Sequence, residues 1–273
     1  MEQLGWITLP FFAVLLQFIL PGKDGQPMFL KKISRENRLL IFLMKMKLGL
    51  NFSAIECIFG VSSQTASTCF YQVLETLLIK TKTWIFLPWK EAIKGSMSDA
   101  FRDYPNCRAI IDCSELRCES PGSVENRILM YSSYKGSFTV KFLIAISPCG
   151  LTTFVSKFYG GKWTDGYITN DSGFLELLDP VDEVLADKGF PQVKSELLHR
   201  KCTLAIPPFG FNPQFTRKEM LEGYSIASVR IHVERAIQSV KIFKIFERVS
   251  HDMFSHVNKM FEWLSFSPTI RNL

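Results

Sequence analysis

Three acidic side chains follow or interrupt apolar stretches that lie far apart in the sequence. Asp112 follows the segment AII, Asp187 follows VLA, and Glu234 lies within a long helical pattern. The first two patterns predict short buried strands that finish on a carboxylate. Carboxylates brought to one place repel one another and take up protons unless a divalent cation compensates their charge. Hard oxygen ligands of this kind suit Mg²⁺ or Mn²⁺, so the three acids predict a metal-dependent site that cuts phosphodiesters.

Seven short blocks surround these acids in a fixed order within about residues 100 to 250. They are IDCSE (111–115), YSSYK (131–135), TVKFL (139–143), ISPCG (146–150), SGFL (172–175), VLADKGF (184–190) and RIHVER (230–235). Together they resemble the DDE endonuclease domain of PIF/Harbinger-type eukaryotic transposases. The resemblance implies an α/β fold, namely an RNase H-like catalytic domain with a mixed sheet and flanking helices. It also implies that Asp112, Asp187 and Glu234 are both the catalytic residues and the metal ligands.

The reaction implied by this resemblance hydrolyses and transfers DNA strands with bound metal ions and needs no protein nucleophile. Four neighbours of the acids, Lys188, Arg230, His232 and Arg235, are candidates for phosphate contacts or charge balance. The alternative is ordinary solvated charge, including a weak Arg230–Glu234 surface ion pair. Asp165 and Glu115 are further carboxylates that can enter the site.

The N-terminal region contains a helix-turn-helix pattern at about residues 53–78. Ser34 is a candidate cap for a first helix that ends near Gly49, Ser53 with Glu56 forms a capping-box pattern, and Ser62 follows the Gly60 turn. The pattern is similar to the helix-turn-helix that precedes the nuclease in the same family.

The DNA-binding interpretation places three polar side chains, Gln64, Ser67 and Thr68, in a major groove. The alternative makes them the solvated side of a small helical bundle. No Lys or Arg occurs from Ser63 to Leu78. Because phosphate neutralisation supplies most DNA affinity, we expect the nuclease region to make most phosphate contacts.

The expected organisation is an all-α N-terminal subdomain (1–80), a connector (81–107) and the nuclease domain (108–273). The pattern predicts strands at 108–118, 138–147, 151–159, 183–187 and 202–206, a loop at 119–136, and helices at 165–178, 191–199 and 219–247. Asp112 and Asp187 are then expected at the carboxyl ends of neighbouring strands. The apolar run 5–20 contains Pro10 and Gln17 and lacks a basic start, so we expect a buried helix and no membrane span.

The 273 residues are 47% hydrophobic, carry a net charge of +6 and include seven cysteines without a Cys-x-x-Cys pair. This composition fits a globular protein of a reducing compartment with a polyanionic partner.

Our first hypothesis is a nuclear, metal-dependent DNA endonuclease or transposase. The alternative is a domesticated DNA- or chromatin-binding protein that no longer cuts. The family resemblance adds a Myb-like DNA-binding protein as a candidate partner and leaves self-association into a homo-oligomer open.

Overall fold

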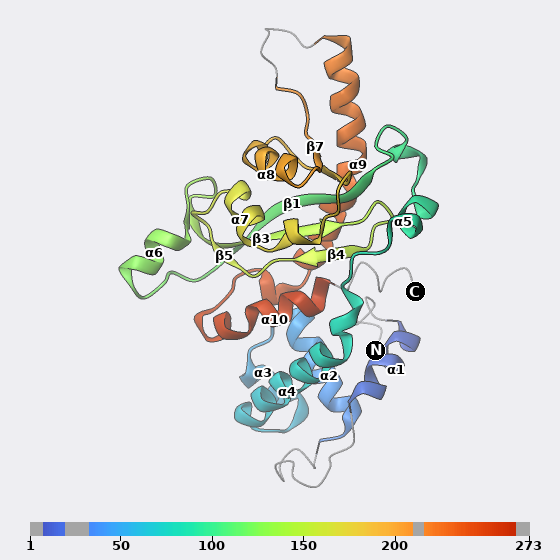
Figure 1. Ribbon diagram of the computed structural model, residues 1–273. Helices are drawn as coiled ribbons and strands as arrows, with labels where there is room; N and C mark the ends of the chain where they lie inside the picture. The colour runs from blue at the N-terminus through green and yellow to red at the C-terminus, as the bar shows by residue number, and fades with distance from the viewer. Residues whose placement is uncertain (1–7, 20–32, 210–215, 266–273) are drawn as a thin grey trace. The chain divides into compact units, whose positions relative to one another are not determined.

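The computed structural model describes residues 8–19, 33–209 and 216–265, which form two compact units (Figure 1). One unit contains the described residues up to Trp84 together with those from Val240 onward. The other unit is Ile85–Ser239. This division differs from the expected nuclease domain of 108–273, because the last helix packs with the N-terminal helices.

Helices make up the first unit, as the sequence predicts for its N-terminal part. They are α1 (Leu9–Phe18), α2 (Arg35–Leu48), α3 (Phe52–Phe59), α4 (Ser63–Thr81) and α10 (Phe254–Ser265), with 3₁₀ turns at Lys82–Trp84, Lys244–Phe246 and His251–Met253. In the described part of the chain, none of the helices combines the length and apolar character of a membrane span.

The helix expected at residues 5–20 is α1, although residues 5–7 and 20 lie outside the described residues. It contacts α2 and α4 and buries Phe11 and Leu15. Pro10 lies in the first turn, where its missing N–H group leaves no helical hydrogen bond unmade. This proline therefore begins the helix and does not interrupt it.

Two of the three expected caps in the helix-turn-helix region are confirmed. Ser34 caps α2 and Ser62 caps α4 through their side chains. The capping box at Ser53 was wrong, because Asn51 caps α3 instead. The Glu56 carboxylate reaches forward across the turn and accepts a hydrogen bond from the backbone N–H of Ser63 at 3.0 Å. Glu56 thus fixes the angle between α3 and α4.

Aromatic packing attaches α10 to the N-terminal helices. The Trp263 ring lies edge-on to Phe42 at 4.8 Å between centroids, and Phe42 stacks on Phe70 of α4 at 5.4 Å. All three side chains are buried. The C-terminal helix therefore supplies core to the helix-turn-helix unit.

A seven-stranded mixed sheet forms the centre of the second unit, which confirms the predicted fold class. Its strands are β1 (Cys107–Arg117), β2 (Tyr131–Ser132), β3 (Ser137–Ile146), β4 (Thr152–Val155), β5 (Tyr159–Gly160), β6 (Glu183–Leu185) and β7 (Thr203–Ala205). The order is β2-β3-β1-β6-β7, with β4 and β5 also paired to β3. β1 runs antiparallel to β3 and parallel to β6, and β6 runs parallel to β7.

The helices of this unit are α5 (Lys90–Ser96), α6 (Val124–Met130), α7 (Asp165–Asp171), α8 (Lys194–His199) and α9 (Arg217–Lys241), with 3₁₀ turns at Asp99–Phe101, Phe174–Leu177 and Pro191–Val193. The loop expected at 119–136 was wrong in part, since it contains α6. The helix expected at 165–178 stops at Asp171, because Gly173 adopts a left-handed conformation (φ 83°). The helix expected at 219–247 ends at Lys241.

One hydrophobic cluster joins the sheet to the helices that follow it. Its members come from β1, β3, β6, α7 and α8 and include Ala109, Ile111, Leu143, Ala145, Ile168, Phe174, Val184, Phe190 and Leu197. This packing fixes α7 and the segment after β6 against the sheet.

Trp263→Ala should destabilise the helical unit by about 3–5 kcal/mol, because it removes a large buried ring from a packed core. The free energy of unfolding, measured by denaturant titration, checks this value. Ile79→Ala is the matched control, since Ile79 is largely exposed on α4, and it should change stability by less than about 0.5 kcal/mol. Equal stability of the two variants would contradict the assignment of α10 to this unit.

Candidate active site

The parallel pairing of β1 and β6 brings Asp112 and Asp187 together. Ile110 pairs with Leu185 in this register, and each acid lies two residues further along its own chain. Since side chains alternate across a strand, the two acids are level and share a face of the sheet. β6 ends at Leu185, so Asp187 lies two residues beyond it and the strand expected at 183–187 is shorter than predicted. Asp112 lies inside β1, which continues to Arg117 because β3 pairs with it from Ile110 onward.

Arg230 connects the second and third acids. Its Nη2 atom lies 3.6 Å from Asp187 Oδ2 and 3.7 Å from Glu234 Oε1. The Arg230 side chain is only 17% exposed, whereas that of Glu234 is 56% exposed. Both carboxylates therefore contact one guanidinium group, which α9 supplies one turn before Glu234.

The Asp112 carboxyl is the most perturbed acid of the site. Burial is the main cause that raises its pKa to about 7, the negative charges of Asp187 and Asp165 raise it further, and Arg230 lowers it. Asp112 thus lies close to the same guanidinium group. At neutral pH its negative charge is incompletely compensated, so additional positive charge would be stabilised here.

Gly189 separates Asp187 from a fourth acid, Asp165. The Gly189 N–H donates a hydrogen bond to Asp187 Oδ1. A Cβ atom at Gly189 would lie 2.9 Å from Asp165 Oδ2 and 3.0 Å from Asp187 Oδ1. Any side chain at this position would therefore collide with one of the two carboxylates.

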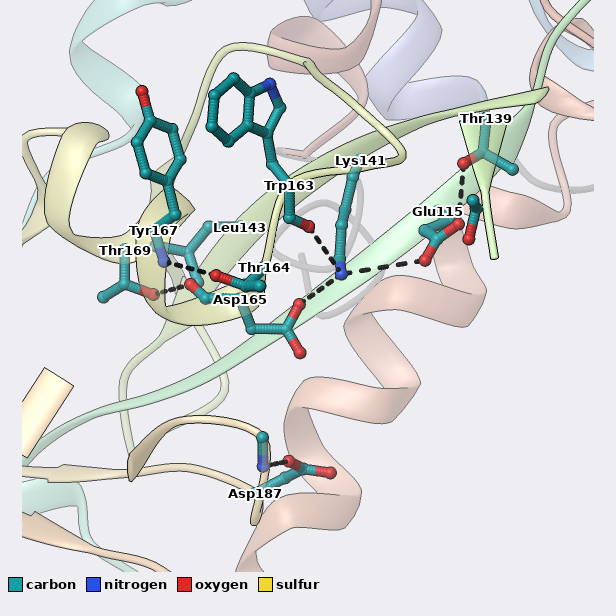
Figure 2. Close-up of polar contacts among 12 residues, drawn as sticks. Glu115, Thr139, Lys141, Leu143, Trp163, Thr164, Asp165, Tyr167, Thr169 and Asp187 are labelled. Atoms are coloured by element: carbon teal, nitrogen blue, oxygen red, sulfur yellow. Dashed lines mark hydrogen bonds and ion pairs between the residues drawn. The ribbon is translucent and has the colours of Figure 1, made fainter. Parts of the chain in front are cut away.

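A second charged group lies beside Asp165, centred on Lys141 of β3 (Figure 2). The Lys141 Nζ atom lies 2.6 Å from Asp165 Oδ1 and 3.8 Å from Glu115 Oε1. Burial alone would lower the pKa of Lys141, but the hydrogen bond and charge of Asp165, together with the charge of Glu115, raise it above its ordinary value. Lys141 therefore remains a cation. This role was not predicted, because no local pattern distinguishes a lysine within an apolar strand.

Asp112, Asp165 and Glu234 are each connected to Asp187, through the strand register, Gly189 and Arg230 respectively, without forming a closed coordination set. Among residues 8–19, 33–209 and 216–265, no three His, Cys, Asp or Glu side chains are placed to hold one metal ion. The oxygen donors still fit Mg²⁺ or Mn²⁺ in their chemistry. The pKa of Asp112 is raised, and Arg230 pairs with both Asp187 and Glu234. Both observations indicate that a cation bound beside these carboxylates would be stabilised.

The predicted phosphate contacts do not all lie beside the acids. Lys188 is exposed and adjacent to Asp187, and Arg230 lies between the carboxylates. His232 is half-buried, with its ring 5.9 Å from that of Phe101. Its pKa is lowered by burial and by the neighbouring Arg235. His232 therefore packs against Phe101.

The candidate DNA-reading residues of the helical unit lie at the start of α4. Gln64 is exposed, whereas Ser67 and Thr68 are half-buried. The Thr68 hydroxyl donates to the Gln64 carbonyl at 2.9 Å, so part of its hydrogen-bonding capacity is used within the helix. Cys69 is buried, and burial raises its pKa to about 12. Cys69 is therefore a core residue and not part of the exposed helix face.

Two family models match this chain. Residues 111–266 match the family described as DDE superfamily endonuclease, which is more than half of the chain and includes all three predicted catalytic acids. Residues 31–83 match the family described as helix-turn-helix of DDE superfamily endonuclease. No curated protein matches the chain.

Asp112→Asn should stabilise the metal-free protein above pH 7. The folded-state pKa of Asp112 is raised, so ionising this carboxyl costs stability as pH rises from about 4 through 7. At about 1.4 kcal/mol per pKa unit, the gain at pH 8 is at most about 4 kcal/mol, and it should vanish below about pH 4. Denaturant unfolding in the presence of a chelator measures it.

Glu176→Gln is the control, because Glu176 is an exposed acid of the same unit. A stability difference between Asp112→Asn and the wild type that does not vary with pH would contradict the buried, uncompensated state of Asp112.

Proposed function

This chain belongs to the family of DDE superfamily endonucleases, and we propose that it is a metal-dependent DNA endonuclease of the transposase type. The observations that support the proposal are the contacts of Arg230 with both Asp187 and Glu234, and the strand register that brings Asp112 level with Asp187. We assign these three acids as the catalytic residues and as the ligands of Mg²⁺ or Mn²⁺. DNA is the substrate, and the helix-turn-helix supports DNA binding as a second function of the same chain.

The proposed roles of the acids and of Arg230 follow from their charges. A divalent cation, when bound, supplies Lewis-acid activation of the scissile phosphate and of the attacking water or 3′-hydroxyl. Asp112, Asp187 and Glu234 supply the negative charge that attracts such a cation. Arg230 compensates part of the negative charge of Asp187 and Glu234, and its planar guanidinium also matches a phosphate group. Arg230 is therefore placed to contact the DNA backbone at the cut.

A covalent route through the nearby thiol is disfavoured by its environment. Cys113 is the residue after Asp112, and burial, followed by the charge of Asp165, raises its pKa far above the ordinary value. A protonated thiol is a poor nucleophile. This supports direct attack by water or by a DNA 3′-hydroxyl.

More specifically, we propose a Harbinger-type transposition reaction in the nucleus. A Myb-like partner protein is the candidate for sequence-specific DNA binding. This more specific proposal rests on the seven sequence blocks and on the absence of Lys and Arg from Ser63 to Leu78. The second candidate function is DNA binding without cleavage. The observation that favours it is that no three metal-binding side chains in the described residues are placed to hold one ion.

Asp112→Asn, Asp187→Asn and Glu234→Gln should each lower metal-dependent DNA cleavage by on the order of 100-fold or more, since each removes a proposed metal ligand. The measurement is nicking of supercoiled plasmid and strand transfer of the element's terminal repeats with Mg²⁺ or Mn²⁺. Glu176→Gln, at an exposed acid of the same unit, should cleave like the wild type. A wild-type chain that binds terminal repeats but never nicks them would favour the second candidate.

Replacing both Lys188 and Arg235 by Ala should weaken DNA binding to all sequences. Each lost phosphate contact should also reduce the slope of log affinity against log salt concentration by about 1. Gln64→Ala should instead change sequence preference, because Gln64 is exposed at the start of α4. Fluorescence anisotropy at several salt concentrations measures both effects.

Lys194→Ala is the control for lost surface charge, because Lys194 is exposed on α8. Tight, salt-sensitive and sequence-selective binding that survives loss of Lys188 and Arg235 would assign the main phosphate contacts to the helix-turn-helix instead.

A further inference from the structure

Lys141 connects Asp165, which lies beside the acid site, to Glu115 near the end of β1. It lies on β3 directly opposite Glu115 of β1. Its ammonium also lies 2.6 Å from Asp165 Oδ1 at the start of α7, and it donates to the Trp163 carbonyl at 3.3 Å. Figure 2 shows these contacts converging on the Lys141 nitrogen from three segments.

The contacts of Lys141 use only one oxygen of Asp165. The other oxygen, Oδ2, lies on the side of Gly189, where Asp187 Oδ1 is the next carboxylate oxygen. In Figure 2 the Asp165 side chain lies between Lys141 and the Asp187 segment. One oxygen of Asp165 is thus paired with Lys141, and the other lies on the side of Asp187.

The backbone of Asp165 is fixed independently of Lys141. The Thr164 hydroxyl accepts a hydrogen bond from the Tyr167 N–H at 3.2 Å and so caps α7. The Thr169 hydroxyl donates to the Asp165 carbonyl at 2.8 Å. The remaining freedom of Asp165 is therefore the rotation of its side chain, which the Lys141 ion pair restricts.

Glu115 provides an internal comparison within the same charged group. Its side chain is 7% exposed, and it accepts a hydrogen bond from the Thr139 hydroxyl at 2.7 Å. It shares the Lys141 ammonium but lies three residues beyond Asp112, so strand alternation places it on the other face of β1. A purely structural role of the ion pairs would make Glu115 and Asp165 equivalent, whereas only Asp165 is close to Asp187.

We propose that Lys141 is a positioning residue of the nuclease site, which fixes Asp165 so that Asp165 acts as a fourth carboxylate in binding the divalent cation. The inference rests on the proposed function, because it assigns further residues to the same metal-dependent site. Gly189 belongs to this arrangement, since a side chain there would separate Asp165 from Asp187.

The test is Mn²⁺ binding to the full-length, metal-free chain without DNA, measured by isothermal titration calorimetry. Asp165→Asn should weaken Mn²⁺ binding by about tenfold or more, which is the usual effect of losing a residue that supports a metal site. Lys141→Met should have a similar effect and Lys141→Arg a smaller one. The double variant should bind no more weakly than Asp165→Asn alone, because both changes act through one carboxylate.

Glu115→Gln is the matched control and should leave the Mn²⁺ dissociation constant within about threefold of the wild type. Thermal unfolding of the metal-free variants separates stability from affinity. If Lys141→Met does not fold, the test rests on Asp165→Asn and Lys141→Arg. Asp165→Asn leaves Lys141 paired with Glu115, and Lys141→Arg keeps a cation beside both acids.

Two outcomes would overturn this inference without contradicting the proposed function. Asp165→Asn with wild-type Mn²⁺ affinity, in a series where Asp112→Asn abolishes binding, would make Asp165 a structural ion-pair partner. Weakened binding by Asp165→Asn with unchanged binding by both Lys141 variants would remove the positioning role of Lys141. A wild-type chain that binds no Mn²⁺ would instead overturn the proposed metal-dependent function itself.

Discussion

Acidic side chains can lie close together only if positive charge lies with them, and this constraint governs the charged site of the second unit. Two cations meet it from different elements. Arg230 of α9 contacts Asp187 and Glu234, and Lys141 of β3 contacts Asp165 and Glu115. Neither cation is well exposed, at 17% and 13% of the side chain. Coulomb interactions are weakly screened in such places, so these contacts set where the acids lie.

The backbone supplies the geometry on which the charges act. The parallel register of β1 with β6 makes Asp112 level with Asp187, and β6 ends at Leu185 while β1 continues to Arg117. Beyond that point, within the described sheet, the edge of β1 next to β6 has no strand partner. Side chains from both faces of the sheet can therefore meet at this edge, which explains how Asp165 on α7 comes close to acids on the other face.

The sequence predicted the features that depend on local pattern. The strands that carry Asp112 and Asp187 and the long helix with Glu234 were recognisable from apolar runs and from the resemblance of the surrounding blocks. α6 was missed because it has only seven residues and follows Pro121 and Gly122, which indicate a loop. None of its residues is buried, so it does not contribute to the core. The packing of α10 against α4 and the ion pairs of Lys141 were also missed. They depend on tertiary contacts between residues distant in sequence, which no local pattern encodes.

Under the proposed function, the two partly buried cations would respond differently to metal and DNA. Arg230 contacts the carboxylates that a divalent cation would bind, so binding of that cation would compete with its ion pairs and release the guanidinium for phosphate. Lys141 contacts Asp165 on the side away from Asp187 and shares its charge with the buried Glu115. Separating Lys141 from these acids would leave buried charges uncompensated, at a cost of several kcal/mol by the usual magnitude. Under the proposed function, Arg230 would therefore be an exchangeable counter-charge and Lys141 a permanent one.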